Sequence, residues 1–179
     1  MKKTVIKFGL IAGLIASAWM VGSIAWCHET GTYEGNMIMG FASMIIAFSL
    51  MFPAIKNYRD KQNNGVISFG KAFKMAFFIA LIGSSMYVAA WLIDYYFFIP
   101  DFMERFSQQL IQKAQHSGAS AAEIAAKIKE INSMKSIYDS VFGVILYTYM
   151  EILPVGIIIA LITALILKRK TNSGNVAVA

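Results

Sequence analysis

Residues 141–167 read VFGVILYTYMEILPVGIIIALITALIL and are followed at once by the basic tripeptide 168–170. A helix of about 20 apolar residues crosses the ~30 Å hydrocarbon layer of a membrane, and this stretch is longer. Its only charged residue is Glu151, and Pro154 follows three positions later. The stretch therefore predicts a transmembrane helix that carries one acid inside the span and ends at a basic cluster.

The composition of the whole chain also indicates a membrane protein. Of the 179 residues, 58% are hydrophobic and only 15% are charged, which is too apolar for an ordinary soluble domain. The formal net charge is +6, but the basic residues flank apolar stretches instead of forming one soluble patch. This pattern favours membrane insertion over nucleic-acid binding. The single cysteine, Cys27, excludes an internal disulfide.

Three further apolar stretches precede the last one, at about residues 5–27, 37–55 and 72–99. No strand-like alternation of polar and apolar residues competes with them. We therefore predict an all-α polytopic membrane protein with four transmembrane helices in a single membrane domain, residues 1–170. The small polar tail, residues 171–179, is predicted to be disordered and cytoplasmic.

The first apolar stretch has the features of either a cleaved signal peptide or an uncleaved anchor. Two lysines precede it, and Ala16-Ser17-Ala18 resembles a cleavage site. However, the apolar sequence continues to Trp26, which is long for a signal peptide. We favour an uncleaved signal anchor.

The charges of the connecting segments predict the orientation. One side carries five basic and eight acidic residues. The other side carries eleven basic residues and one acid, Asp60; the basic residues are Lys2, Lys3, Lys7, Lys56, Arg59, Lys61, Lys71, Lys74, Lys168, Arg169 and Lys170. Both termini are therefore predicted to lie in the cytoplasm, and the short connection 28–36 outside.

The long external connection, residues 100–140, is predicted to form a helical hairpin. Asp101 can cap a helix over about 102–115, and Gly118 suits the left-handed residue that ends it. The sequence 120–123 (SAAE) is a capping box that begins a second helix. Each helix has an apolar stripe, formed by Phe102, Phe106, Leu110 and Ala114 in the first and by Ile124, Ile128, Ile131 and Met134 in the second. We favour packing of these stripes within the chain over a dedicated binding face.

Small residues at four-residue spacing predict where the transmembrane helices pack, because close contact drives their association. Such stripes are Gly9, Gly13 and Ser17 in the first span, Ala72, Ala76, Ala80 and Ser84 in the third, and Gly156, Ala160 and Ala164 in the fourth. They predict a tight intramolecular bundle, with homodimerisation as the alternative. Pro53 and Pro154 are expected to kink or end their helices.

Glu151 is the strongest candidate for a functional residue, because an acid inside a span is costly and is a functional hypothesis by default. Tyr147 lies one turn earlier and Pro154 loosens the next turn. Two interpretations stay open: a structural clasp between helices, which we favour, and a proton or ion carrier. Asp94, near the outer end of the third span and followed by aromatic residues, is expected at the water boundary.

No pattern in the sequence predicts an enzyme, a metal site or a cofactor. Cys27, His28 and Glu29 are consecutive and would point in different directions on a helix, whereas a structural metal site needs four suitably spaced ligands. The other histidine, His116, lies in the predicted hairpin turn. Catalytic, phosphate-binding and dinucleotide-binding motifs are missing from the sequence.

Several segments together resemble a family of bacterial membrane proteins designated domain of unknown function 4199. These segments are GFASMIIAFSLMFPAIKNYRD (40–60), ISFGKAFK (67–74), PDFMERF (100–106), SGASAAEIAAK (117–127) and EILPVGIIIALITALILKRK (151–170). The resemblance implies a four-span protein of the inner membrane of a Gram-negative bacterium. It implies no activity, substrate or catalytic residue.

The sequence therefore favours a non-catalytic accessory or scaffold component, whose external hairpin or small-residue stripes contact another membrane protein or a second copy. The alternative is a small proton- or ion-coupled carrier that uses Glu151. In either case the lipid bilayer is the surrounding partner, and no nucleic acid is expected.

Overall fold

The computed structural model describes residues 1–31 and 37–169, which fold almost entirely into helices. The elements are α1 (Lys2–Thr30), α2 (Met37–Ser49), α3 (Met51–Gln62), α4 (Phe69–Ile93), the π-helical segment η1 (Asp94–Phe98), α5 (Phe102–His116), α6 (Ala121–Tyr138) and α7 (Val141–Leu167). Over these residues four helical stretches are long and apolar enough to cross a membrane: Lys2–Thr30, Ile38–Gln62, Phe69–Phe98 and Val141–Leu167. The predicted all-α polytopic fold is confirmed.

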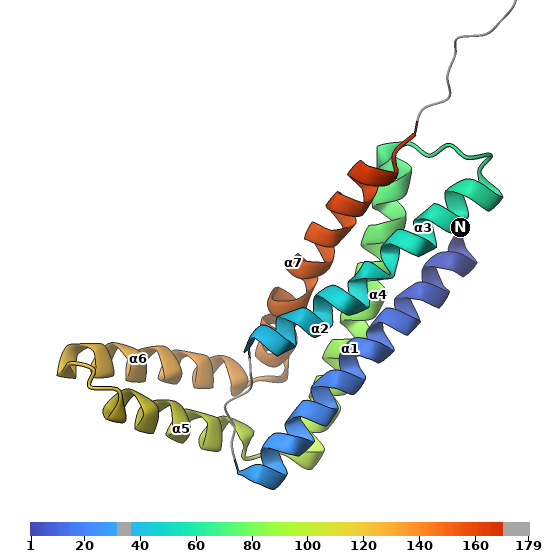
Figure 1. Ribbon diagram of the computed structural model, residues 1–179. Helices are drawn as coiled ribbons and strands as arrows, with labels where there is room; N and C mark the ends of the chain where they lie inside the picture. The colour runs from blue at the N-terminus through green and yellow to red at the C-terminus, as the bar shows by residue number, and fades with distance from the viewer. Residues whose placement is uncertain (32–36, 170–179) are drawn as a thin grey trace, which may run out of the picture.

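Helix α4 lies at the centre of the bundle. Its most extensive contacts are with α1 and α7, while α2 and α3 contact α1 and α7 as well (Figure 1). The N-terminus and the end of α7 lie at one end of the bundle, which we call the terminal end. Helices α5 and α6 leave the bundle at the opposite end, which we call the hairpin end (Figure 1).

The predicted small-residue stripes lie between the spans and allow very close helix contacts. A Cβ atom added to Gly13 of α1 would lie 2.8 Å from the Cβ of Met86 in α4. On the other side of α4, a Cβ on Gly156 of α7 would lie 2.8 Å from the Cβ of Ala80. All ten residues of these stripes are buried: Gly9, Gly13, Ser17, Ala72, Ala76, Ala80, Ser84, Gly156, Ala160 and Ala164. These stripes are therefore used inside one chain.

The second span differs from the prediction, which placed it at residues 37–55. Helix α2 ends at Ser49, and α3 begins at Met51 and continues to Gln62. Pro53 explains the interruption, because proline has no N–H to donate and its ring collides with the carbonyl four residues earlier. Pro154, in contrast, does not end α7, which continues to Leu167.

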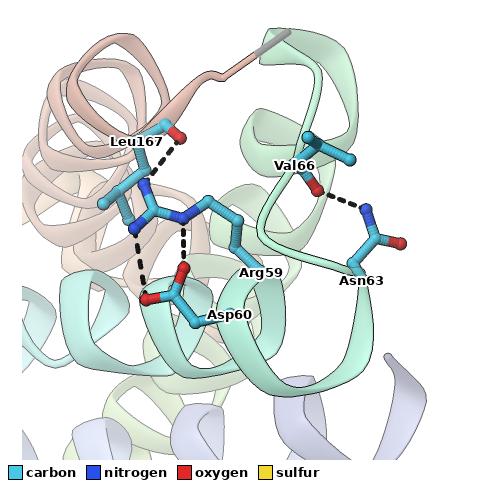
Figure 2. A network of polar contacts seen from close by, with 5 residues as sticks. All are labelled: Arg59, Asp60, Asn63, Val66 and Leu167. Carbon is cyan, nitrogen blue, oxygen red and sulfur yellow. Dashed lines mark hydrogen bonds and ion pairs between the residues drawn. The ribbon is translucent and has the colours of Figure 1, made fainter. Parts of the chain in front are cut away.

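Polar contacts join α3 to the last residues of α7 at the terminal end. The guanidinium of Arg59 donates from Nε to the Asp60 carboxylate over 2.6 Å and from Nη1 to the Leu167 carbonyl over 3.3 Å (Figure 2). The main chains of Ile67 and Arg169 also exchange two hydrogen bonds, of 3.1 and 2.8 Å. The chain that follows α3 is thus tied directly to the end of the last span.

The turn predicted at residues 63–65 lies between α3 and α4. Asn64 and Gly65 both have positive φ angles, 52° and 75°. The Asn63 side chain donates to the Val66 carbonyl (Figure 2) and accepts a 2.7 Å hydrogen bond from Lys71 Nζ. The asparagine therefore holds both the turn and the start of the third span.

Helices α5 and α6 contact each other and project sideways from the bundle (Figure 1). Gly118 has a φ of +73°, the left-handed conformation predicted for it, and Ser120 and Glu123 form the predicted capping box. The predicted cap by Asp101 is wrong: its side chain makes no capping hydrogen bond. Its carboxylate instead accepts a 2.6 Å hydrogen bond from Arg105 Nε, and this ion pair occupies the group that would have capped the helix.

A series of aromatic rings connects the hairpin to the spans, and we call it the aromatic chain. Neighbouring rings have centroids between 5.2 and 5.8 Å apart, within the usual range for stabilising aromatic pairs. In order of contact its members are Phe106, Phe102, Trp91, Tyr95, Tyr138 and Tyr147. The chain thus runs from α5 through α4 and η1 to α6 and α7.

Candidate functional site

Glu151 lies on the outer side of α7, about 15 Å along that helix from its first residue at a rise of ~1.5 Å per residue. Its side chain is exposed, whereas the next residue, Ile152, is completely buried against the bundle. Pro154 and Ile158, one and two turns later, are also exposed. The carboxylate therefore belongs to an otherwise apolar surface of the fourth span.

Two tyrosines lie close enough to Glu151 to be affected by its charge: Tyr87 of α4 and Tyr138 at the end of α6. Burial raises the pKa of the Tyr138 hydroxyl above its usual range, and the negative charge of Glu151 raises it further. The rings of Tyr138 and Tyr147 are in edge-to-face contact, with centroids 5.6 Å apart. The predicted pair Glu151 and Tyr147 thus lies at the junction of two spans and the hairpin.

The Glu151 carboxylate has no hydrogen bond to any residue within 1–31 and 37–169. A nearby polar contact joins α4 and α7 without involving Glu151: Ser85 Oγ and Tyr149 Oη lie 2.7 Å apart. The predicted clasp between helices therefore has neighbouring tyrosines but no hydrogen bond. The carboxylate is left available to a group outside the chain.

Asp94, predicted at the water boundary, is covered by neighbouring helices. Its side chain is only 8% exposed, and its Oδ2 atom is buried without a hydrogen-bond partner in the described part of the chain. The side chain is enclosed because α1 runs parallel to α4 and continues to Thr30. The last turns of α1 therefore lie beside and beyond Asp94 and cover it.

Asp94 lines a pocket of about 370 Å³ between the last turns of α1 and the end of the third span. The polar residues of its lining are His28, Glu29 and Asp94. The apolar residues are Val21, Ile24, Ala25, Phe98 and Ile99. Glu151 does not contribute to this lining, so the structure places the two candidate acids in separate environments.

The backbone at Asp94 is irregular. Residues 94–98 form a π-helical turn, in which the Ile99 N–H donates to the Asp94 carbonyl over 3.0 Å. Such wide turns cost stability and occur frequently at functional sites. No stretch of the sequence predicted this turn, because it depends on how the aromatic residues 95–98 pack.

The structure adds four residues to the candidates, and each had a weak signal in the sequence. Tyr87 lies seven residues before Asp94 on α4, and Tyr138 closes the hairpin just before the last span. His28 and Glu29 follow Cys27 in the sequence, but Cys27 is buried and is not among the lining residues of the pocket. Within the described residues no three His, Cys, Asp or Glu side chains lie where they could hold a metal ion.

Comparisons with curated proteins and with solved structures find no significant match. The sequence profile of one family, described as "Protein of unknown function (DUF4199)", matches residues 7–169. The match begins in α1, ends after α7 and so includes all four spans. It agrees with the resemblance found in the sequence segments, and the chain therefore belongs to the DUF4199 family.

Proposed function

We propose that this protein is a non-catalytic accessory component of a membrane assembly, which binds a helix of another integral membrane protein through the outer face of α7. The observation that carries the proposal is Glu151, a carboxylate exposed on a span and without a hydrogen bond in the described chain. The partner helix would carry a hydrogen-bond donor at the depth of Glu151.

Energetics supports a partner at this position. An acid near the centre of a membrane helix costs about 2.5 to 3.5 kcal/mol on insertion scales, and such residues are almost always paired or directed away from lipid. Further along α7, exposed side chains on the same side of the helix are apolar, among them Ile158 at 57% and Ile162 at 51% exposure. A helix that packs on this face would cover the isoleucines and satisfy the carboxylate together.

The positions of the small-residue stripes indicate that a partner would bind to another surface of the protein. They are buried between α1, α4 and α7, so they are not accessible to a second copy in this arrangement.

We also propose that the protein resides in a bacterial inner membrane with both termini in the cytoplasm. The concentration of basic residues at the terminal end supports this orientation.

A photo-crosslinking experiment tests the partner directly. A photoreactive amino acid is placed at Ile158, two turns after Glu151 on the outer face of α7, and the adducts are recovered from native membranes and identified by mass spectrometry. We expect a discrete adduct with one integral membrane protein, and we expect the substitution Glu151→Leu to abolish it. The matched control is the same photoreactive group at Ile152, which is completely buried and should give no intermolecular adduct.

Two results would contradict the proposal. One is an adduct pattern at Ile158 that remains unchanged after Glu151→Leu. The other is the capture of lipid alone at that position. The substitution Glu151→Gln, which keeps the shape and removes the charge, then reports whether the partner's donor is a cation or a neutral group.

The alternative function is a small proton- or ion-coupled carrier, favoured by one specific observation, the two tyrosines within electrostatic reach of Glu151. Hydroxyl groups beside a titratable acid can take part in proton transfer. Purified protein in liposomes should then move protons or a solute, and Glu151→Gln should stop the movement. Transport that is absent, or that is equal in both proteins, contradicts this alternative.

A further inference from the structure

We infer that the pocket at the hairpin end binds a primary ammonium group attached to an apolar body, with Asp94 as the residue that receives the ammonium. This inference is independent of the partner proposed for Glu151. It depends on the unpaired oxygen of Asp94, on the shape of the pocket and on the kinds of residue that line it.

The first step concerns the state of Asp94. The side chain is more than nine-tenths buried, it lines the pocket, and its Oδ2 has no hydrogen-bond partner within the described residues. A buried acceptor without a donor is a costly arrangement, and most buried polar groups in native proteins have a partner. The wall of the pocket therefore includes a carboxylate with unsatisfied hydrogen-bonding capacity, with which a donor bound in the pocket can pair.

The second step concerns depth. The parallel contacts of Gly13 with Gly83 and Met86 set the register between α1 and α4, and this register places Asp94 near the level of Val21. His28 is seven residues further along α1, or about 10 Å towards the hairpin end. Asp94 thus lies deep in the pocket, while His28 and Glu29, both exposed, lie at its outer part.

The third step concerns charge and shape. Among the described residues, the lining includes two carboxylic acids and no lysine or arginine, so its electrostatic potential favours a cation. The remaining walls are apolar and include Val21, Ala25 and Phe98, which suits a hydrophobic body. The volume of about 370 Å³ lies within the range of small-molecule sites, which is roughly 300 to 1,000 Å³.

The fourth step selects the kind of cation. The described residues provide no set of three ligating side chains that could hold a metal ion. A quaternary ammonium has no N–H to donate, whereas a primary ammonium has three donors and can form a hydrogen-bonded ion pair with the Asp94 carboxylate. Two sources share this chemistry: a free amine, and the headgroup of phosphatidylethanolamine with its acyl chain on the apolar wall.

The test uses the full-length chain in nanodiscs of phosphatidylglycerol and measures binding of tritiated 2-phenylethylamine. We expect saturable binding that excess unlabelled amine displaces and that the neutral analogue 2-phenylethanol does not. Replacing Asp94→Asn keeps the shape and removes the charge, and should weaken binding about tenfold or more. The matched control is Asp139→Asn, an exposed aspartate at the same end that does not line the pocket.

Gel filtration and circular dichroism report whether the Asp94→Asn variant is folded. If it is not, a second variant keeps the test valid. Ala25 is exposed and lines the pocket, so Ala25→Trp fills the apolar part from a position that tolerates a larger side chain. We expect Ala25→Trp to abolish amine binding without any change in charge.

A further arm separates the two sources. If the headgroup is the natural occupant, nanodiscs that contain phosphatidylethanolamine weaken amine binding, and the purified wild-type protein retains this lipid while Asp94→Asn does not. If a free amine is the occupant, the affinity is the same in both membranes. Either result supports the inference. Absence of saturable amine binding, equal binding of amine and alcohol, or no loss in the Asp94 and Ala25 variants would overturn it.

Discussion

Gly13 and Gly22 lie on the same helix and have opposite surroundings. A Cβ on Gly13 would be 2.8 Å from the Cβ of Met86 and 3.1 Å from the Cα of Gly83, whereas a Cβ on Gly22 would meet nothing within 4 Å. The first position is limited by the backbone of the neighbouring span and the second is not. Comparing substitutions at these two glycines therefore tests the packing between α1 and α4 directly.

We predict that Gly13→Ala destabilises the bundle by about 1 to 3 kcal/mol, because the added methyl group forces α1 away from α4. Gly22→Ala, the control, should leave the stability unchanged or raise it by up to about 1 kcal/mol through its helix propensity. Unfolding by titration of a denaturing detergent into mild micelles measures both. Equal effects of the two substitutions would mean that α1 does not pack on α4 as described.

A second residue-scale prediction concerns Glu123, whose carboxylate accepts hydrogen bonds of 2.8 Å from both the N–H and the Oγ–H of Ser120. These bonds lower the pKa of Glu123. Because the folded pKa lies below the unfolded one, the capping box stabilises α6 fully above the unfolded pKa and loses this contribution as pH falls through the folded pKa.

We therefore expect Ser120→Ala to raise the pKa of Glu123 towards its ordinary value, as measured by NMR titration of the labelled glutamate carboxyl group. Ser133→Ala, in the exposed middle of the same helix, should leave that pKa unchanged. If Ser120→Ala has no effect on the titration of Glu123, the capping box does not form in solution.

At the scale of the elements, the hairpin depends on the aromatic chain for its position. Trp91 is the central member: it contacts Phe102 of α5 at 5.2 Å and Tyr95 of η1 at 5.8 Å between ring centroids. Few other side chains of α5 are buried, chiefly Met103 and Ser107. The hairpin should thus be sensitive to this one residue.

We predict that Trp91→Leu increases hydrogen exchange throughout residues 102–138 and leaves the exchange of the spans nearly unchanged. Loss of the indole removes the ring contact that fixes α5. For comparison, truncating a large buried aromatic side chain to alanine lowers the free energy of unfolding by about 3 to 5 kcal/mol. Trp26→Leu is the matched control, because Trp26 is 69% exposed and has no place in the aromatic chain. Comparable protection of the hairpin in both variants would show that other contacts hold it.

The sequence predicted some elements well and others poorly, for identifiable physical reasons. Length and apolar content define a membrane span, and the capping box at Ser120 is a local hydrogen-bond pattern, so both could be predicted. The turn at Gly118 is likewise a local property. The π-helical turn at Asp94 depends on how the aromatic residues 95–98 pack, and the burial of the Asp94 side chain depends on where α1 lies. No local pattern encodes either.

In the candidate site, too, features that depend on the local sequence could be predicted, and features that depend on the tertiary arrangement could not. Glu151 was predicted because a single acid within an apolar stretch is conspicuous in the sequence itself. Its tyrosine neighbours Tyr87 and Tyr138 come from two other helices, and only the tertiary arrangement brings them together. The break at Leu50 illustrates an intermediate case: Pro53 predicted a disturbance, but the helix resumes immediately and continues to Gln62.

At the scale of the whole molecule, the architecture is a four-span bundle around α4, with a hairpin at one end and the N-terminus and the end of α7 at the other (Figure 1). The terminal end is closed by the contact of Arg59 with Leu167 (Figure 2) and by main-chain hydrogen bonds between Ile67 and Arg169. The two candidate sites are separate in this arrangement: Glu151 faces outward along a span, and Asp94 lines a pocket at the hairpin end. Both interpretations require that these two ends lie on opposite sides of a membrane.

Labelling of single cysteines with a membrane-impermeant maleimide tests this requirement most directly. In a Cys27→Ala background, Gln62→Cys reports on the terminal end and Gln115→Cys on the hairpin turn, since both glutamines are exposed. In intact cells we predict rapid labelling at residue 115 and labelling at residue 62 only after the membrane is permeabilised. Equal labelling of both positions from one side of the membrane would contradict the four-span arrangement.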